Sequence, residues 1–133
     1  MVNTAYALNS YTRARVVGGS PVELIIMLYD GAIEFLHKAS TAVNMQNLQT
    51  KLKYIDKTLA IIQELDRSLN FEAGGEISIN LHNLYNYMMK ELVLANINYD
   101  ADKLMHIRGL LENLRKAWVE VRNKVEAGEV EVP

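Results

Sequence analysis

The sequence predicts an all-α protein: an up-down-up-down antiparallel four-helix bundle with a short N-terminal arm or helix. The chain of 133 residues has only two prolines and seven glycines, whereas a sandwich or barrel needs many turns rich in both. Apolar residues recur at steps of three and four along four segments of similar length. Short connections between such segments favour antiparallel neighbours, and the length suits one domain.

The first helix has a clear start. Ser20-Pro21-Val22-Glu23 forms a capping box with proline at the first helical position; the serine oxygen accepts the Glu23 amide, and the glutamate can reach back to the serine amide. We expect this helix over 20–45. Residues 1–19 are only weakly periodic, and we interpret them as an N-terminal arm in which Leu8 and Tyr11 can share one side.

Three further helices complete the bundle, which we expect to span 20–126. Residues 44–50 are polar and are interpreted as a loop, and helices follow at about 51–70, 76–98 and 100–125. Gly74-Gly75 separates the second helix from the third, and Asp100 is a good N-cap for the fourth. The tail, 127–133, is expected to fray. The core stripe expected for the second helix is Leu52, Ile55, Leu59, Ile62 and Leu69.

Composition excludes several classes of function. The 14 basic and 16 acidic residues nearly balance, and the basic ones form no run, so a nucleic-acid site has no electrostatic footprint. The absence of cysteine excludes thiol catalysis and cysteine-ligated metals, and it suits the cytosol. The most apolar stretch, 22–36, is too short and too charged to span a bilayer, and we see no signal peptide. We therefore expect a cytoplasmic protein that is not an enzyme, with no cofactor, no nucleic-acid partner and no membrane insertion.

A metal site is the chemistry that a four-helix bundle itself suggests. A di-iron site needs two Glu-x-x-His motifs and two further glutamates. Glu34-Phe35-Leu36-His37 supplies one motif, but His82 and His106 have no glutamate three residues earlier. Glu34 and His37 also fall on the polar side of their helix. We therefore expect a solvated face and no metal.

Apolar residues exceed what one bundle core needs. A bundle helix needs one apolar stripe, roughly three positions in seven, but three of the four predicted helices carry a second apolar group beside it. Large exposed apolar patches mark interaction sites, and an amphipathic helix is the natural ligand of an apolar groove. The candidate partner-binding residues are Leu24, Met27, Leu28, Gly31, Phe35, Tyr54, Ile61, Leu65, Met89, Val93 and Ile97.

Three blocks of the sequence carry a family resemblance. The first block is Ser20-Pro21-x-Glu23-Leu24-Ile25-x-Met27-Leu28-Tyr29-Asp30-Gly31-Ala32. The second is Gly74-Gly75-Glu76-Ile77, followed by Leu84-Tyr85-x-Tyr87-Met88 and Ala95-Asn96-x-x-x-Asp100, and the third is Leu110-Leu111-x-x-x-Arg115-x-Ala117-Trp118. Together they resemble the FliS family, the flagellin-specific secretion chaperones of bacterial flagella, from about Tyr11 to Val125.

The resemblance implies a cytosolic helical bundle with no enzymatic activity and no cofactor. It implies that the chain binds the C-terminal segment of flagellin, which is disordered until assembly, and so stops flagellin from polymerising in the cytosol. It further implies delivery of the complex to the export-gate protein of the flagellar type III secretion apparatus. Other flagellar regulators stay open as further partners.

The resemblance also implies a role for the arm. Tyr11 corresponds to the family's N-terminal tyrosine, ten residues before Pro21, and Leu8 takes the place of its apolar partner. The family's arm covers part of the groove and takes part in docking at the export gate. We expect Leu8 and Tyr11 to pack on Leu24 and Leu28 in the free protein until flagellin displaces them.

Two alternatives stay open beside this reading. One is a helical-bundle adaptor, or a homodimer with no flagellin client, whose surplus apolar surface is only its dimer interface. The other is a metal-binding bundle. For the free chain we expect a monomer or a weak homodimer.

Overall fold

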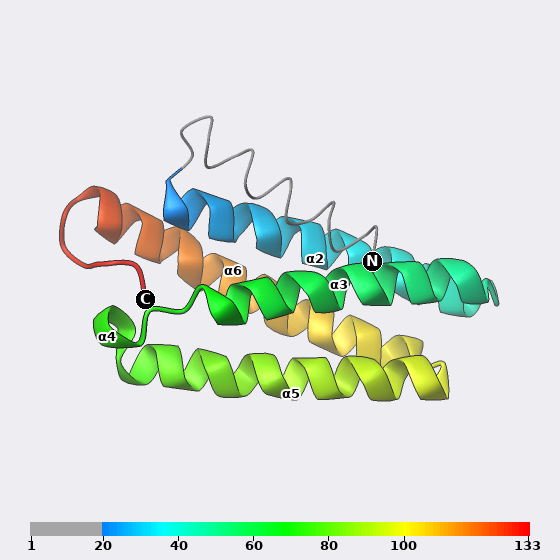
Figure 1. Ribbon diagram of the computed structural model, residues 1–133. Helices are drawn as coiled ribbons and strands as arrows, with labels where there is room; N and C mark the ends of the chain where they lie inside the picture. Colours follow the sequence, from blue (N-terminus) through cyan, green and yellow to red (C-terminus); the bar gives the residue numbers. More distant parts are fainter. Residues whose placement is uncertain (1–19) are drawn as a thin grey trace.

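The computed structural model describes residues 20–133, and within that range every regular element is a helix (Figure 1). The all-α prediction is confirmed. The expectations for 1–19, including those for Leu8 and Tyr11, lie outside the described residues. The elements are α2 (Pro21–Asn44), α3 (Leu48–Arg67), α4 (Phe71–Gly74), α5 (Glu76–Asn98) and α6 (Ala101–Glu126). None of the helices in this range is long and apolar enough to cross a membrane.

The four long helices form a closed ring in which each packs against the next. α2 contacts α3 and α6, and α5 contacts α3 and α6. Cross-helix pairs show that neighbours are antiparallel, because residue numbers fall on one helix as they rise on the other. On α2 and α6, Glu23 pairs with Arg122 and Asp30 with Arg115. The same holds between α3 and α5, where Lys51 meets the Asn96 carbonyl and Asp66 meets His82.

Side chains cap the N-termini of α2 and α6 at the residues that the sequence predicts. Two details differ from the prediction: the partner of the Glu23 carboxylate and the start of α3. Ser20 accepts the Glu23 amide at 3.2 Å as expected, but the Glu23 carboxylate pairs with Arg122 instead of returning to the serine amide. Asp100 accepts the Lys103 amide at 3.0 Å and starts α6. Because Asn47 also caps, α3 begins at Leu48, three residues earlier than expected.

The connection between α3 and α5 contains a short helix, α4, that the sequence analysis does not predict. Asn70 accepts the Ala73 amide at 3.0 Å and starts the single turn α4, so α3 ends at Arg67 instead of near residue 70. Gly75 then takes φ 51°, in the left-handed region that favours glycine, and turns the chain into α5. The predicted bounds of α5 agree with the structure.

The C-terminal tail differs from the frayed segment that we expected. Val132 packs against the core and Pro133 is buried. The tail approaches α4 so closely that a Cβ at Gly74 would lie 3.0 Å from the Pro133 Cα. Apolar contact with the open end of the bundle therefore holds the tail, which composition alone does not reveal.

A polar cluster sits inside the apolar core and joins three helices. The Tyr29 hydroxyl of α2 lies 2.5 Å from the Tyr85 hydroxyl of α5, and the Trp118 indole N–H of α6 donates to the Tyr29 oxygen at 3.1 Å. Burial raises the pKa of Tyr85 to about 12 and holds the pKa of Tyr29 well above its ordinary value. Both phenols therefore stay protonated at neutral pH and act as hydrogen-bond partners.

Candidate functional site

Eight of the eleven candidate residues lie along the line where α2 and α3 meet, which we call the α2–α3 seam. The rings of Phe35 and Tyr54 lie 5.6 Å apart across it. Further along, a Cβ at Gly31 would lie 3.3 Å from the Ile61 Cδ1. The eight residues are Leu24, Met27, Leu28, Gly31 and Phe35 on α2 and Tyr54, Ile61 and Leu65 on α3.

Burial divides the seam into a floor and an accessible rim. Leu28, Ile61 and Leu65 belong to the hydrophobic core. The assignment of Ile61 and Leu65 to a surplus apolar group is therefore wrong. Leu24 is also buried, although it is not a member of the central core cluster. The rim consists of Met27, which is 39% exposed, with Gly31, Phe35 and Tyr54, which are half-buried.

The missing side chain at Gly31 explains why Ile61 is core. Contact of the α2 backbone with the Ile61 side chain at this point brings α2 and α3 close together, and the α2-facing side of α3 is buried as a result. The opposite edge of the expected stripe then faces solvent: Leu52 is 47% exposed. The expectation that Leu52 belongs to the core is therefore wrong, whereas Ile55 and Ile62 are buried as expected.

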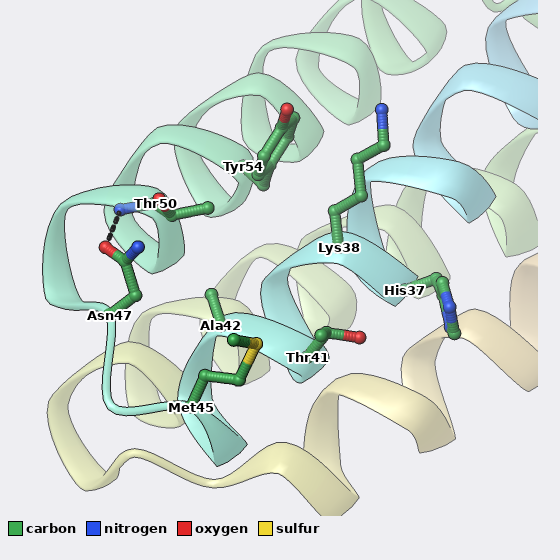
Figure 2. Close-up of a pocket in the computed structure, with 8 residues that line it drawn as sticks. All are labelled: His37, Lys38, Thr41, Ala42, Met45, Asn47, Thr50 and Tyr54. Carbon is green, nitrogen blue, oxygen red and sulfur yellow. Dashed lines mark hydrogen bonds between the residues drawn. The ribbon is translucent and has the colours of Figure 1, made fainter.

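At the end nearest the α2–α3 loop, the seam opens into a cavity of about 370 Å³. Figure 2 shows its lining, with Lys38 and Tyr54 extending on the same side of the two helices. Ala42 and Met45 supply apolar surface, and the rest of the described lining is polar: His37, Lys38, Thr41, Asn47, Thr50 and Tyr54. The cavity adjoins the accessible rim of the seam, because Tyr54 belongs to both.

The other three candidates lie apart from the seam, on α5. Met89, Val93 and Ile97 are spaced by four residues and so share one face of that helix. Met89 packs partly against the core, whereas Val93 and Ile97 are 47% and 64% exposed. Nothing brings this face next to α2, because α2 and α5 are not neighbours in the ring. The structure therefore separates the candidates into two surfaces.

Two titratable groups of α2 beside the seam form an ion pair. Glu34 pairs with Lys38 at 3.2 Å, and in residues 20–133 no three histidines or acidic residues are grouped so that they could hold a metal ion. Lys38, whose pKa this hydrogen bond with Glu34 raises, stays charged. An accessible apolar rim with charged edges is suited to binding another polypeptide.

Comparison with known proteins decides the family. A family model described as flagellar protein FliS matches residues 3–125. The chain belongs to the FliS family. The flagellar secretion chaperone FliS of Salmonella typhimurium is 38% identical over 121 residues, 90% of this chain and 89% of that protein. The flagellar secretion chaperone FliS of Campylobacter jejuni is 33% identical over 91% of this chain and 93% of that protein, and that of Bacillus subtilis is 36% identical over 86% and 81%.

Family membership settles one general question. FliS is a family of flagellar chaperones and not of enzymes, so the expectation that the chain is not an enzyme is confirmed.

Proposed function

We propose that the chain is a cytosolic export chaperone that binds the C-terminal region of flagellin, prevents its premature polymerisation and delivers it to the flagellar type III export apparatus. The observation that carries this proposal is the accessible rim of the α2–α3 seam, in a member of a family whose relatives are named flagellar secretion chaperones. A chaperone of this kind needs an apolar docking surface on a stable scaffold, and the seam supplies one.

The apolar rim of the seam is suited to binding an amphipathic helix. The terminal helices of flagellin are amphipathic and pack together in the filament, so a surface that takes the place of their partner helices masks them. Met27 is suited to this contact, since its flexible thioether adapts to irregular surfaces. A segment that orders only on binding loses conformational entropy, so the affinity stays moderate for the area covered, which suits a cargo that has to be released.

Calorimetric titration with a C-terminal flagellin segment tests the proposal, with one variant on each surface. Met27→Glu places a charge on the rim of the seam, and Ile97→Glu places the same charge on the exposed face of α5. We expect a one-to-one complex with a negative heat-capacity change and a gain of helical signal. Met27→Glu should weaken binding by about tenfold or more, and Ile97→Glu should leave it unchanged.

The other outcomes have definite meanings. Loss of binding only in Ile97→Glu moves the cargo to the α5 face and refutes the seam. No binding by the unmodified chain, together with a dimer whose mass does not respond to flagellin, favours the homodimer with no flagellin client. Both variants change exposed side chains, so thermal unfolding should show folded proteins in each case.

The arm completes the proposal. We propose that Leu8 and Tyr11 cover apolar surface near Leu24 and Leu28 in the free chain and take part in docking at the export-gate protein. Deleting residues 1–16 should then increase binding of a hydrophobic dye and promote self-association, because apolar surface is uncovered. A truncated chain that stays monomeric and binds no dye refutes this role of the arm.

A further inference from the structure

The C-terminal tail lies across an apolar groove at one end of the bundle. After α6, the backbone takes φ 75° at Gly128 and turns back toward α4 (Figure 1). Val132 then packs against the hydrophobic core, and Pro133 is buried beside Gly74. Residues 130–133, which we call the strap, therefore connect the end of α6 back to α4 and the start of α5.

The groove under the strap is formed by α5 and α6. The interface between these two helices is the least extensive of the four in the ring, so the helices alone leave a groove between them. Pro133 lies in this groove and helps to enclose a cavity of about 140 Å³. The groove side chains are Ile77, Leu81, Leu114, Ala117, Trp118 and Val121. All six are apolar, so the groove is suited to an apolar ligand.

The strap fills this groove only in part. A second cavity, of about 350 Å³, lies between the strap and the end of α4, and its lining includes Lys124 and Glu131. Ile77 and Pro133 line both cavities. Protein interiors are close-packed and contain few voids larger than a water molecule. The strap is therefore seated on the bundle in the manner of a bound ligand and is not an integral part of the core.

Apolar contact alone holds the strap in place. Within residues 20–133, no hydrogen bond or ion pair involves residues 130–133, and the last backbone bond of the chain joins the Glu129 amide to the Lys124 carbonyl at 2.9 Å. Val130 is exposed. Burial of the other two apolar side chains gains free energy of the same order as the ordering of four residues costs. The docked and released forms of the strap therefore lie close in free energy, while the helices stay folded in both.

We propose that the strap is a releasable cover, and that the groove beneath it binds another short, extended segment of the same kind when the strap lifts off. The strap itself shows the chemistry that the groove accepts: two adjacent apolar residues, Val132-Pro133, after the acidic Glu131. A residue before proline favours extended backbone. Glu131 shares its cavity with Lys124, while Pro133 also lines the apolar cavity. A segment that binds only the released form shifts the equilibrium toward that form.

The groove lies opposite the α2–α3 seam. In the ring, α5 and α6 contact each other on the side away from the line where α2 meets α3. A segment in the groove and a helix in the seam therefore do not compete for the same side chains, so the groove adds a second site to the proposed function and does not depend on it. In the free chain the strap covers Trp118 and its apolar neighbours, which lowers the exposed apolar area that promotes self-association.

Variants of the full-length chain test this proposal with a peptide as the probe. The peptide has the sequence of residues 127–133 and an acetylated N-terminus. Val132→Asp with Pro133→Gly removes the apolar contacts of the strap and leaves the sequence of every helix unchanged. Trp118 is the only tryptophan of the chain and is buried in the groove next to Pro133, so its fluorescence reports whether the groove is covered. Circular dichroism measures the helix content of each variant.

The double variant is expected to open the groove without unfolding the bundle. Its helix content should equal that of the unmodified chain, and the emission of Trp118 should move to longer wavelength. The peptide should bind the double variant saturably and reverse that shift. The unmodified chain should bind the peptide at least about tenfold more weakly, because its own strap keeps the groove closed and the apparent affinity falls with the fraction of open molecules.

A matched pair of substitutions locates the bound peptide. Ile77→Glu and Ile79→Glu, each added to the double variant, place the same charge on α5 at side chains that are 59% and 51% exposed. Ile77 lines the groove, whereas Ile79 is two residues away and points to a different side of the helix. Ile77→Glu should weaken peptide binding by about tenfold or more, and Ile79→Glu should change it by less than about twofold.

Four results would overturn the proposal. Equal peptide affinity of the unmodified chain and the double variant shows that the strap does not control access, and no binding to the double variant shows that the groove is not a binding site. Equal effects of the two isoleucine substitutions place the peptide elsewhere. Loss of helix content in the double variant makes the strap a part of the core and not a cover. Because no flagellin is used, the result is independent of the proposed function.

Discussion

Replacing Tyr29 by phenylalanine should destabilise the bundle by about 3 kcal/mol, more than the same change at Tyr85, which should cost about 1 kcal/mol. The reason is the asymmetry of the buried cluster. The Tyr29 oxygen meets both the Tyr85 hydroxyl at 2.5 Å and the Trp118 indole N–H at 3.1 Å. Tyr29→Phe leaves two buried polar groups without a partner, and each costs about 1–3 kcal/mol. Tyr85→Phe leaves the Trp118 bond in place.

The double variant sharpens the prediction. With both tyrosines replaced, only the Trp118 N–H loses its partner, so the double variant should cost about 2 kcal/mol, less than Tyr29→Phe alone. Adding the second substitution to the first should therefore restore stability. Urea unfolding followed by circular dichroism measures the free energies, and the melting temperature should fall by about 4 °C per kcal/mol in a chain of this size.

Two results would refute this reasoning. If Tyr29→Phe costs no more than Tyr85→Phe, the Tyr29 oxygen is not the shared centre of the cluster. If the two single costs add in the double variant, the two hydroxyls do not act through one hydrogen-bond network. Because both rings keep their apolar surface, neither variant creates a large cavity that would obscure the comparison.

Three further predictions concern other parts of the fold. Burial raises the pKa of both core tyrosines, that of Tyr85 to about 12, so the folded state holds their protons more tightly than the unfolded state does. The free energy of unfolding, measured in urea, should therefore fall as the pH rises from about 10 to about 12, and the fall should be smaller in Tyr85→Phe. Gly74→Ala, whose methyl group would overlap the Ser78 Oγ and lie 3.0 Å from the Pro133 Cα, should lower the melting temperature, at a cost of about 1–3 kcal/mol. Gly109→Ala on α6, which has open space, should raise it slightly. Lys51→Met should cost about 1–2 kcal/mol in urea unfolding, because it removes the 3.0 Å bond to the Asn96 carbonyl near the end of α5.

The parts of the fold that the sequence predicted are those with local signals. Ser20 and Asp100 each accept an amide three residues ahead, and this capping depends only on residues within one turn. The polar composition of 44–50 predicts a loop, and this prediction is wrong at the start of α3, where Asn47 accepts the Thr50 amide and caps the helix. The turn α4 was missed for a similar reason, since Asn70 gives a cap signal but only one turn of helix follows.

The parts of the candidate site that the sequence could not predict depend on which helices become neighbours. The periodicity of α3 identifies an apolar side but not how closely α2 approaches it. Gly31 decides that distance, and it turns Ile61 from a surplus residue into core while Leu52 faces solvent. The contact of the Lys38 ammonium with the Tyr54 ring has the same origin, because these two residues come together only through the register of α2 on α3.

The buried hydrogen bonds hold the helices in register while the seam stays accessible to a partner. Apolar contacts fix the register of helices weakly when part of the apolar surface is left for a partner, because a helix that slides by one turn can exchange one set of apolar contacts for another. Hydrogen bonds among Tyr29, Tyr85 and Trp118 tolerate no such shift, since they need O and N atoms within about 3 Å. They join α2 to α5 and α6, on the side of α2 away from the seam. A core fixed in this way keeps Met27 and Phe35 in place on α2 while their outer faces stay available, so the scaffold does not depend on the cargo for its shape.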